Sequence, residues 1–301
     1  MEAWVVIAIA AAAFQTLRFM LQKHLSMGAL STGGATFSRF FYSVPFLVPL
    51  ATAYAFLSGE GVPEFGRAFW VYAFVGGLSQ ILATWCVVAL FQQRNFAVGI
   101  TFKKTEVLLT ALVGLAVLGD KISLAGFVAI FLGLLGVLVL SQDPRESDGS
   151  LLSRVVNLGT GLGLLSGIFF AFSAVGYRGA TLEVLSSDPL YRAAISLMLV
   201  TLGQTVGMLI WLKLREPGEI GRVIAARRMA VWMGVTGMVG SLCWFTAFTL
   251  QNAAYVFAVG QIEVVFSLAA SALFFREIVT RKELTGIGLI TASILCLVVA
   301  A

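Results

Sequence analysis

The sequence predicts an all-helical integral membrane protein, with ten transmembrane helices arranged as two inverted five-helix repeats. Hydrophobic residues make up 59% of the chain and charged residues only 12%, and the mean hydropathy is +0.96. These values lie outside the range of soluble globular proteins. The apolar runs are continuous and do not alternate with a period of two, which indicates helices and not a β-barrel.

Each predicted span is long enough to cross a bilayer, since about 20 mostly apolar residues cross roughly 30 Å of hydrocarbon. The spans, in chain order, are 3–24, 32–57, 68–92, 97–118, 123–141, 157–178, 188–213, 229–250, 255–275 and 282–301. The polar connections between them are short, so we expect no soluble domain. The first span carries Glu2 at its amino end and its basic residues late, which reverses the charge order of a signal peptide.

Several functional classes are excluded by what the chain lacks. The net charge of +5 is spread over short connections, so we expect no nucleic-acid partner. Cys86, Cys243 and Cys296 lie in apolar runs without metal-ligand spacing. The sequence has no HExxH, GxSxG, P-loop or CxxC motif. We therefore expect no enzymatic activity, no ATP-driven pumping, no metal and no organic cofactor.

The two halves of the chain match at an offset of 157 positions. The clearest pairs are Asn95 and Asn252, Glu106 and Glu263, and Asp120 and Glu277. Each half holds five spans, an odd number, so the second half enters the membrane in the opposite sense to the first. Inverted repeats of this kind build secondary transporters that enclose a site near the membrane midplane. We assign the first repeat to 1–141, a polar linker to 142–156 and the second repeat to 157–301.

Both halves also carry the same short motifs in the same order. Each has an acidic turn before its last helix, LGDKIS at 118–123 and FREIVT at 275–280. Each has an arginine near the start of its second helix, in SRFFYSVP at 38–45 and YRAAISL at 191–197. This order resembles the EamA-type branch of the drug/metabolite transporter superfamily over essentially the whole chain. The resemblance implies a carrier of small metabolites, with a central cavity lined by the first, third and fourth helices of each half.

Polar side chains within the spans are the candidate substrate-binding residues. A charge within lipid costs roughly 2.5–3.5 kcal/mol, so it usually faces a wet interior or a partner. Gln15, Arg18 and Gln22 are three and four residues apart, which places them on one face of the first helix. We expect this polar stripe to form a cavity wall.

The fourth span begins with Lys103 and Lys104, where the resemblance implies small or apolar residues. Lys103 and Glu106 share a helix face and can pair, which leaves Lys104 to meet another group. We expect all three residues to line the cavity. The alternatives are lysines that snorkel to the interface or a purely structural ion pair.

Glu263 is the counterpart of Glu106 in the second half. A buried carboxylate without a cation can take up a proton, so Glu263 is a candidate for proton coupling. An interhelical hydrogen-bonded carboxyl group is the alternative. Trp85 and Trp244 lie mid-span beside polar residues, and we assign them to the cavity wall. We expect Arg39 and Arg192, at related positions, to tie helices to backbone carbonyls or headgroups.

Glycines mark close helix contacts. Gly159, Gly163 and Gly167 recur every four residues, and Gly203 and Gly207 repeat the spacing once. Such faces let helix backbones approach each other. They predict either internal packing or a homodimer through the Gly159/Gly163/Gly167 face.

The sequence therefore predicts a secondary transporter or facilitated exporter in the lipid bilayer of a bacterial inner (plasma) membrane. Its small-molecule substrate would be a polar, zwitterionic or anionic metabolite, such as an amino acid or related compound, moved by alternating access. Because cations outnumber anions among the intramembrane charges, a flippase for a lipid-linked phosphate is the alternative. The resemblance places both termini in the cytoplasm, whereas the distribution of Lys and Arg over the connections favours termini outside.

Overall fold

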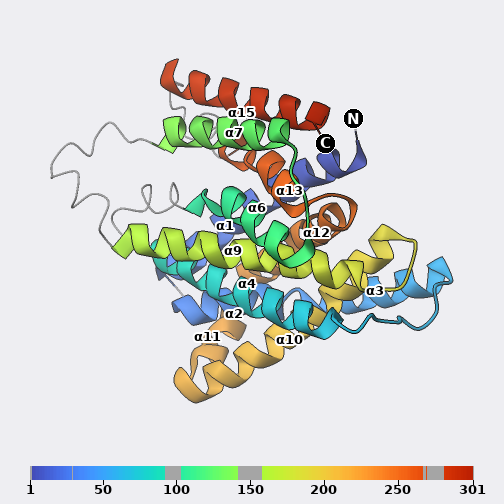
Figure 1. Cartoon of the computed structure of the whole chain (residues 1–301). Coiled ribbons are helices and arrows are strands. Elements are labelled where there is room, and N and C mark those ends of the chain that lie inside the picture. Colours follow the sequence, from blue (N-terminus) through green and yellow to red (C-terminus); the bar gives the residue numbers. More distant parts are fainter. Residues whose placement is uncertain are drawn as a thin grey trace.

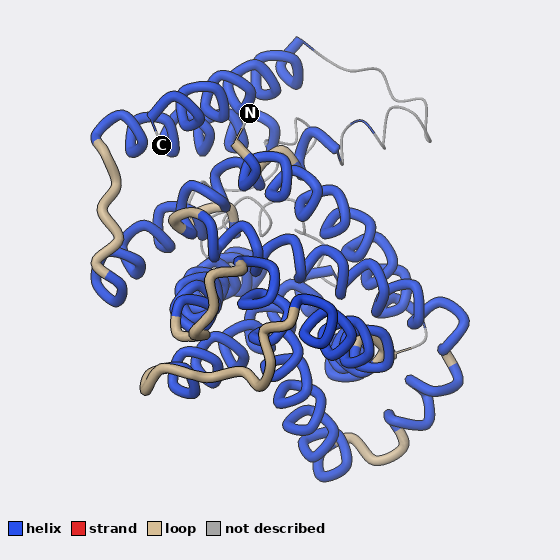
Figure 2. Tube along the Cα trace, turned by 90° about the vertical axis from the view of Figure 1, so that its right-hand side faces the viewer, coloured by secondary structure: helices blue, strands red, loops and turns tan. Residues whose placement is uncertain are grey.

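Helices form all the regular elements in the described part of the computed structural model, which comprises residues 2–28, 30–91, 103–141, 158–266, 269 and 281–300. Figure 1 shows their arrangement, and Figure 2 shows the helices and loops from the side. In chain order the helices are α1 (Ala3–Gly28), α2 (Thr32–Phe41), α3 (Val44–Ser58), α4 (Phe69–Phe91), α6 (Glu106–Leu118), α7 (Leu124–Ser141), α9 (Leu158–Leu182), α10 (Pro189–Arg215), α11 (Glu219–Ala225), α12 (Arg227–Leu250), α13 (Ala253–Gly260) and α15 (Arg281–Ala300).

The prediction of an all-helical membrane protein is confirmed, while the count of ten spans stays a prediction. Within the described residues, six helical stretches are long and apolar enough to cross a membrane: Ala3–Ser26, Thr32–Ser58, Phe69–Phe91, Leu158–Leu182, Pro189–Arg215 and Arg227–Leu250. Four shorter apolar helices overlap the other predicted spans: Glu106–Leu118, Leu124–Gly136, Ala253–Phe266 and Leu284–Cys296. The predicted linker 142–156, Asn95 and Glu277 lie outside the described residues.

The predicted span 32–57 is interrupted, because α2 ends at Phe41 and α3 begins at Val44. Pro45 occupies the first turn of α3. Proline has no N–H to donate to the carbonyl four residues earlier, that of Phe41, and its ring clashes with that carbonyl. Ser43 Oγ lies 2.6 Å from the Arg39 carbonyl and 2.8 Å from the Gly234 carbonyl of α12. The interruption thus holds the last turn of α2 against α12.

The two halves interleave instead of packing as separate bundles. The first helix of each half packs along the third helix of the other half, α1 on α12 and α9 on α4. The last helices, α7 and α15, lie side by side (Figure 1). The fourth helices, α6 and α13, also meet. The centre of the molecule is therefore built from the first, third and fourth helices of both halves.

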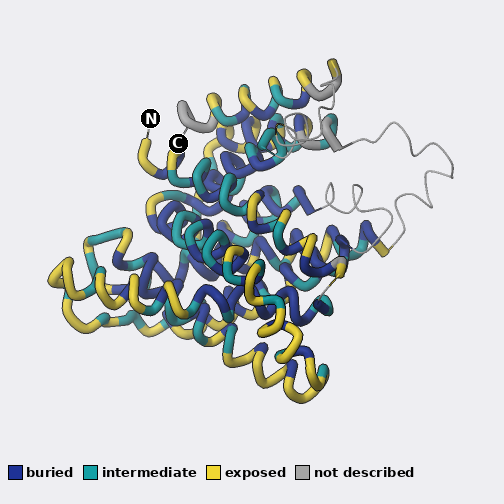
Figure 3. Tube along the Cα trace, turned by 180° about the vertical axis from the view of Figure 1, so that it is seen from behind, coloured by how far each residue is buried: buried dark blue, intermediate teal, exposed yellow. Residues whose placement is uncertain are grey.

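Burial follows the pattern of a protein in lipid. Large apolar side chains such as Phe56, Phe74 and Leu124 are 86%, 71% and 80% exposed. Figure 3 shows exposed residues along the outer helices and buried residues along the inner ones. Charged side chains such as Arg18 and Lys104, by contrast, are buried. Apolar outer faces of this extent are suited to contact with hydrocarbon.

A glycine contact lets α4 and α9 cross closely. A Cβ added to Gly176 would lie 2.7 Å from Gly76 Cα and 3.0 Å from the Tyr72 carbonyl oxygen. Both neighbours are backbone atoms, which cannot move aside as a side chain can. The absence of a Cβ at Gly176 is therefore required for this crossing.

We expect Gly176→Ala to lower the free energy of unfolding by about 1–3 kcal/mol, because overpacking forces the two backbones apart. Thermal unfolding in detergent measures the loss. Gly203→Ala is the matched control, since a Cβ there meets no atom within 4 Å. Equal melting temperatures for the two variants would contradict the close crossing.

Candidate functional site

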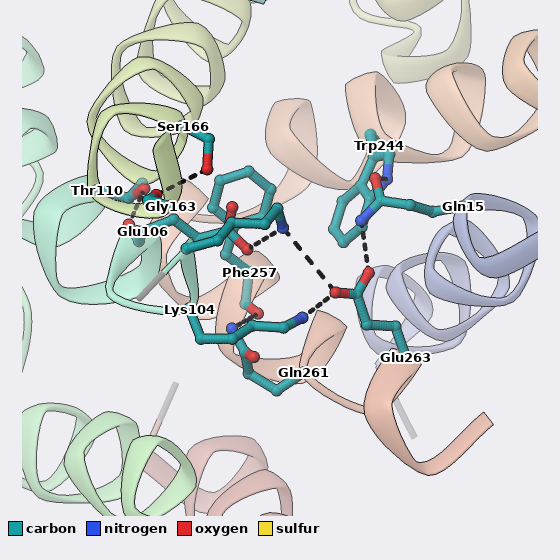
Figure 4. Close-up of polar contacts among 11 residues, drawn as sticks. Gln15, Lys104, Glu106, Thr110, Gly163, Ser166, Trp244, Phe257, Gln261 and Glu263 are labelled. Atoms are coloured by element: carbon teal, nitrogen blue, oxygen red, sulfur yellow. Dashed lines mark hydrogen bonds and ion pairs between the residues drawn. The ribbon is translucent and has the colours of Figure 1, made fainter. Parts of the chain in front are cut away.

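Four buried charged side chains meet at the centre of the molecule: Lys103, Lys104, Glu106 and Glu263, here called the charged cluster. Lys103 Nζ lies 2.9 Å from Glu106 Oε1 and 3.9 Å from Glu263 Oε1. Lys104 Nζ forms an ion pair with Glu263 Oε1 (Figure 4). The ion pair between Lys104 and Glu263 joins the two halves of the chain.

The lysines do not snorkel outward, since each side chain is only 2% exposed. Lys103 pairs with Glu106 within its own segment, as the sequence predicts. Glu263 lies beside a cation, so the premise that made it a candidate for proton coupling is not met. The structure thus describes the cluster as two coupled ion pairs.

The charged cluster sits at equivalent backbone turns in the two halves. The backbone turns at residues 104–105, just before α6, and again at 261–262, just after α13. These positions lie 157 residues apart, the same offset that relates Glu106 to Glu263. Gln261 occupies the place of Lys104 in the second half, and its buried Oε1 has no hydrogen-bond partner in the described structure. Glu106 and Glu263 therefore each follow an equivalent backbone turn.

Gln15 connects α1 to the charged cluster. Its Nε2 donates to Glu263 Oε2 at 2.6 Å, and its Oε1 accepts from Trp244 Nε1 at 3.1 Å (Figure 4). These two bonds fix the orientation of the amide. Gln15 and Trp244, both predicted cavity residues, thus contact the cluster from α1 and α12.

Arg18 and Gln22 lie farther along α1, in a second polar group with Arg39. Arg18 NH1 donates to Gln22 Oε1 at 3.3 Å, and Gln22 Nε2 donates to the Ala35 carbonyl at 3.1 Å. The Arg18 guanidinium lies over the Phe19 ring, 4.2 Å from its centroid. The predicted stripe on α1 is therefore divided between two groups of polar residues.

Trp85 lies apart from these groups. Its ring meets Trp211 edge-on, with centroids 4.8 Å apart, and it packs against the cluster of buried side chains around α2 and α10. Its assignment to the substrate site stays a prediction.

Two small cavities lie beside Arg39. One, of about 30 Å³, is lined by polar and aromatic side chains that include Gln15, Gln80, Ser173 and Trp244. The other, of about 20 Å³, includes Gln204. A cavity needs about 10–15 Å³ to hold one water. The two cavities therefore have room for a few waters. They are too small to hold a metabolite unless the surrounding helices separate.

The sequence did not assign Arg39 to the site. Its NH1 and NH2 donate to the hydroxyl groups of Thr84 and Ser241, at 3.1 and 3.2 Å. The expected contact with backbone carbonyls or headgroups is therefore wrong for Arg39. It is confirmed for Arg192, whose Nε donates to the Thr181 carbonyl at 2.7 Å. Pro45, three residues after Tyr42, was the sequence signal that α2 ends here and that Arg39 therefore lies in its last turn.

Polar contacts close the bundle beyond the site at both ends. Arg178, in the last turns of α9, binds Asp120 with its Nε at 2.9 Å, and its NH1 donates to the carbonyls of Phe248 and Gln251 at 2.6 and 2.9 Å. Glu219 of α11 accepts from the backbone N–H of Ser31 at 2.6 Å, just before α2. Because successive spans alternate in direction, these contacts lie at opposite ends.

The glycine face of α9 is buried within the chain. Gly159, Gly163 and Gly167 are all buried, and a Cβ on Gly167 would lie 3.1 Å from the Lys103 carbonyl oxygen. Gly167 thus packs α9 against the start of α6, in line with the internal alternative of the two predicted. Association into a homodimer stays a prediction.

Comparison with known proteins adds independent evidence. The chain is similar to the EamA-like transporter family, whose model matches residues 2–142 and again 157–299. Among solved structures, 28 chains match. One crystal structure of a protein, 15% identical in sequence, has a TM-score of 0.71 and covers 99% of this chain and 97% of its own. At that identity it shows the fold alone. No curated protein matches the chain.

Proposed function

The chain belongs to the EamA-like transporter family, and from this premise we propose that it is a secondary transporter of a small polar metabolite, zwitterionic or anionic. The ten predicted helices would form two inverted repeats, 1–141 and 157–301, joined by the linker 142–156. The two repeats would rock about a central site in the inner membrane of a bacterium.

The observation that carries this proposal is the ion pair between Lys104 and Glu263, which is buried and joins the two halves. A buried ion pair is weak evidence for stability, because its desolvation offsets much of its attraction. A charged solute that pairs with one side chain can therefore replace the other, if the displaced side chain finds another partner, as Glu263 has in Lys103 at 3.9 Å. Its carboxylate or phosphate would take the place of Glu263 beside Lys104, or its amino group the place of Lys104 beside Glu263. Either exchange loosens the contact between the halves, which couples binding to rocking.

The test is thermal stabilisation of the purified protein by a panel of amino acids, organic acids, sugar phosphates, nucleotides and lipid phosphates. We expect a saturable shift with one zwitterionic or anionic class. The shift is lost in Lys104→Ala if the anionic group of the solute binds the cluster, and in Glu263→Gln if its amino group does. Lys121→Ala is the matched control, because that lysine is exposed in the turn after α6. A shift that survives in both Lys104→Ala and Glu263→Gln would remove the cluster from the solute site.

One observation favours a lipid-linked phosphate as the alternative substrate. A groove of about 270 Å³ lies between α4 and α10, lined by exposed apolar side chains such as Trp70 and Phe74. Gln204 lines both this groove and the 20 Å³ cavity. It donates to the Gly77 carbonyl at 2.9 Å and to the Tyr177 hydroxyl at 3.1 Å. Movement of the Gln204 side chain would connect the 20 Å³ cavity to the lipid-facing groove. Thermal stabilisation by lipid phosphates alone would support a flippase.

A further inference from the structure

The interior of the described structure holds two guanidinium groups that no carboxylate balances. Arg18 is 2% exposed and Arg39 is 7% exposed. The ion pairs among the described residues include neither of them. Both central carboxylates, Glu106 and Glu263, are already held by lysines. Uncompensated charge in a low-dielectric interior is costly, so it marks a place where an anion is stabilised.

The two arginines lie close together against the same glycine. A Cβ built on Gly237 of α12 would lie 3.3 Å from Arg18 Cδ and 3.4 Å from Arg39 Cγ. Both side-chain stems therefore pass over one small residue on the helix that packs along α1. Like charges on two neighbouring side chains repel each other, and an anion bound beside them offsets that repulsion.

Hydrogen-bond donors remain for such an anion. A guanidinium carries five N–H donors. Arg39 uses two of them on Thr84 and Ser241, and Arg18 uses one on Gln22. Arg18 NH2 is buried and has no hydrogen-bond partner in the described residues. Planar guanidinium groups bind carboxylate and phosphate in a bidentate manner, which suits this pair to an oxyanion.

We infer that Arg18 and Arg39 form an oxyanion subsite, distinct from the charged cluster, that takes the carboxylate or phosphate group of the transported solute. This inference rests on the proposed transport function and narrows its substrate class to compounds that carry such a group. Arg39 lines both central cavities, and Gln15, which lines the larger one, contacts the charged cluster. A solute bound between the two places would have its anionic end at the arginines.

The experiment measures thermal stabilisation of the purified protein by inorganic phosphate and by acetate at constant ionic strength, with chloride as the reference salt. A parallel arm uses short-chain phosphatidic acid in the detergent micelle. We expect a saturable shift whose apparent dissociation constant rises about tenfold or more in Arg39→Gln and in Arg18→Gln, since each removes charge-assisted hydrogen bonds. Arg192→Gln, which removes the related arginine of the second half, is the matched control and is expected to keep the shift.

The outcomes separate the subsite from the transport function. A shift with phosphate or acetate that depends on the arginines supports a free solute, and the same dependence with phosphatidic acid alone supports a lipid headgroup. Lys104→Ala is expected to keep the phosphate shift within about threefold, because the subsite is distinct from the cluster. An absent shift, or one that is equal in the wild type and both arginine variants, overturns the inference. The proposed transport function is still supported in that case if stabilisation by a ligand of the wider panel requires Lys104 or Glu263. If Arg39→Gln fails to fold, Arg18→Gln gives the same readout.

Discussion

Replacement of Lys104 by methionine is expected to lower the free energy of unfolding by about 3–5 kcal/mol, because it leaves the buried Glu263 carboxylate without its closest cation. Glu263→Met is expected to cost a similar amount, since it leaves Lys104 unpaired. Lys103 Nζ lies 3.9 Å from Glu263 Oε1, so some compensation remains in the first variant. Thermal unfolding in detergent, followed by tryptophan fluorescence, measures both losses.

The double variant with methionine at both positions is the control. Removing both charges leaves no unpaired ion. We therefore expect the double variant to lose about 1–3 kcal/mol less stability than the two single losses add up to. Strictly additive losses would mean that the two side chains do not interact. The double variant also separates folding from function, because a folded protein without the pair is expected to lose ligand stabilisation.

Arg178 is expected to be the second most sensitive position, because it ties α9 to two other segments of the chain. Its guanidinium binds Asp120 after α6 and the carbonyls of Phe248 and Gln251 at the end of α12. We expect Arg178→Met to lower the free energy of unfolding by about 3 kcal/mol or more, because it strands a carboxylate that is only 14% exposed together with two carbonyls. Thermal unfolding in detergent gives the magnitude.

Arg178→Lys distinguishes charge from geometry at this position. A lysine keeps the charge beside Asp120 but lacks the planar fork that reaches both carbonyls, so an intermediate loss is expected. Arg67→Met, which removes an arginine from the connection between α3 and α4, is the control and is expected to cost less than about 0.5 kcal/mol. If Arg178→Met lowered the free energy of unfolding no more than this control, the contacts of Arg178 would not contribute to stability.

Local features of the fold were predictable from the sequence, whereas the pairing of distant helices was not. Continuous apolar runs predict helices because every backbone polar group must be satisfied within lipid. The pairing of Lys103 with Glu106 follows from their spacing on one helix. The ion pair of Lys104 with Glu263 joins residues 159 positions apart, and helical spacing alone does not say which helices meet.

Arg39 illustrates a second limit. As a residue near the start of a long span, it was expected to bind carbonyls or headgroups at the membrane surface. The interruption before Pro45 shortens α2, and Arg39 then falls in its last turn beside α4 and α12. The proline was visible in the sequence, but its effect on the neighbouring arginine depends on which helices pack around α2.

The interleaving of the two halves has a consequence for biogenesis. Gln15 of α1 finds its partners on α12 and beside α13, about 230–250 residues later in the chain. At a synthesis rate of about 5–20 residues per second, roughly ten to fifty seconds separate the emergence of α1 from that of its partners. During this interval the amide group of Gln15 lacks its final contacts. Until the last third of the protein has been made, α1 therefore needs a polar environment for this side chain, such as the insertion channel or a chaperone in the membrane.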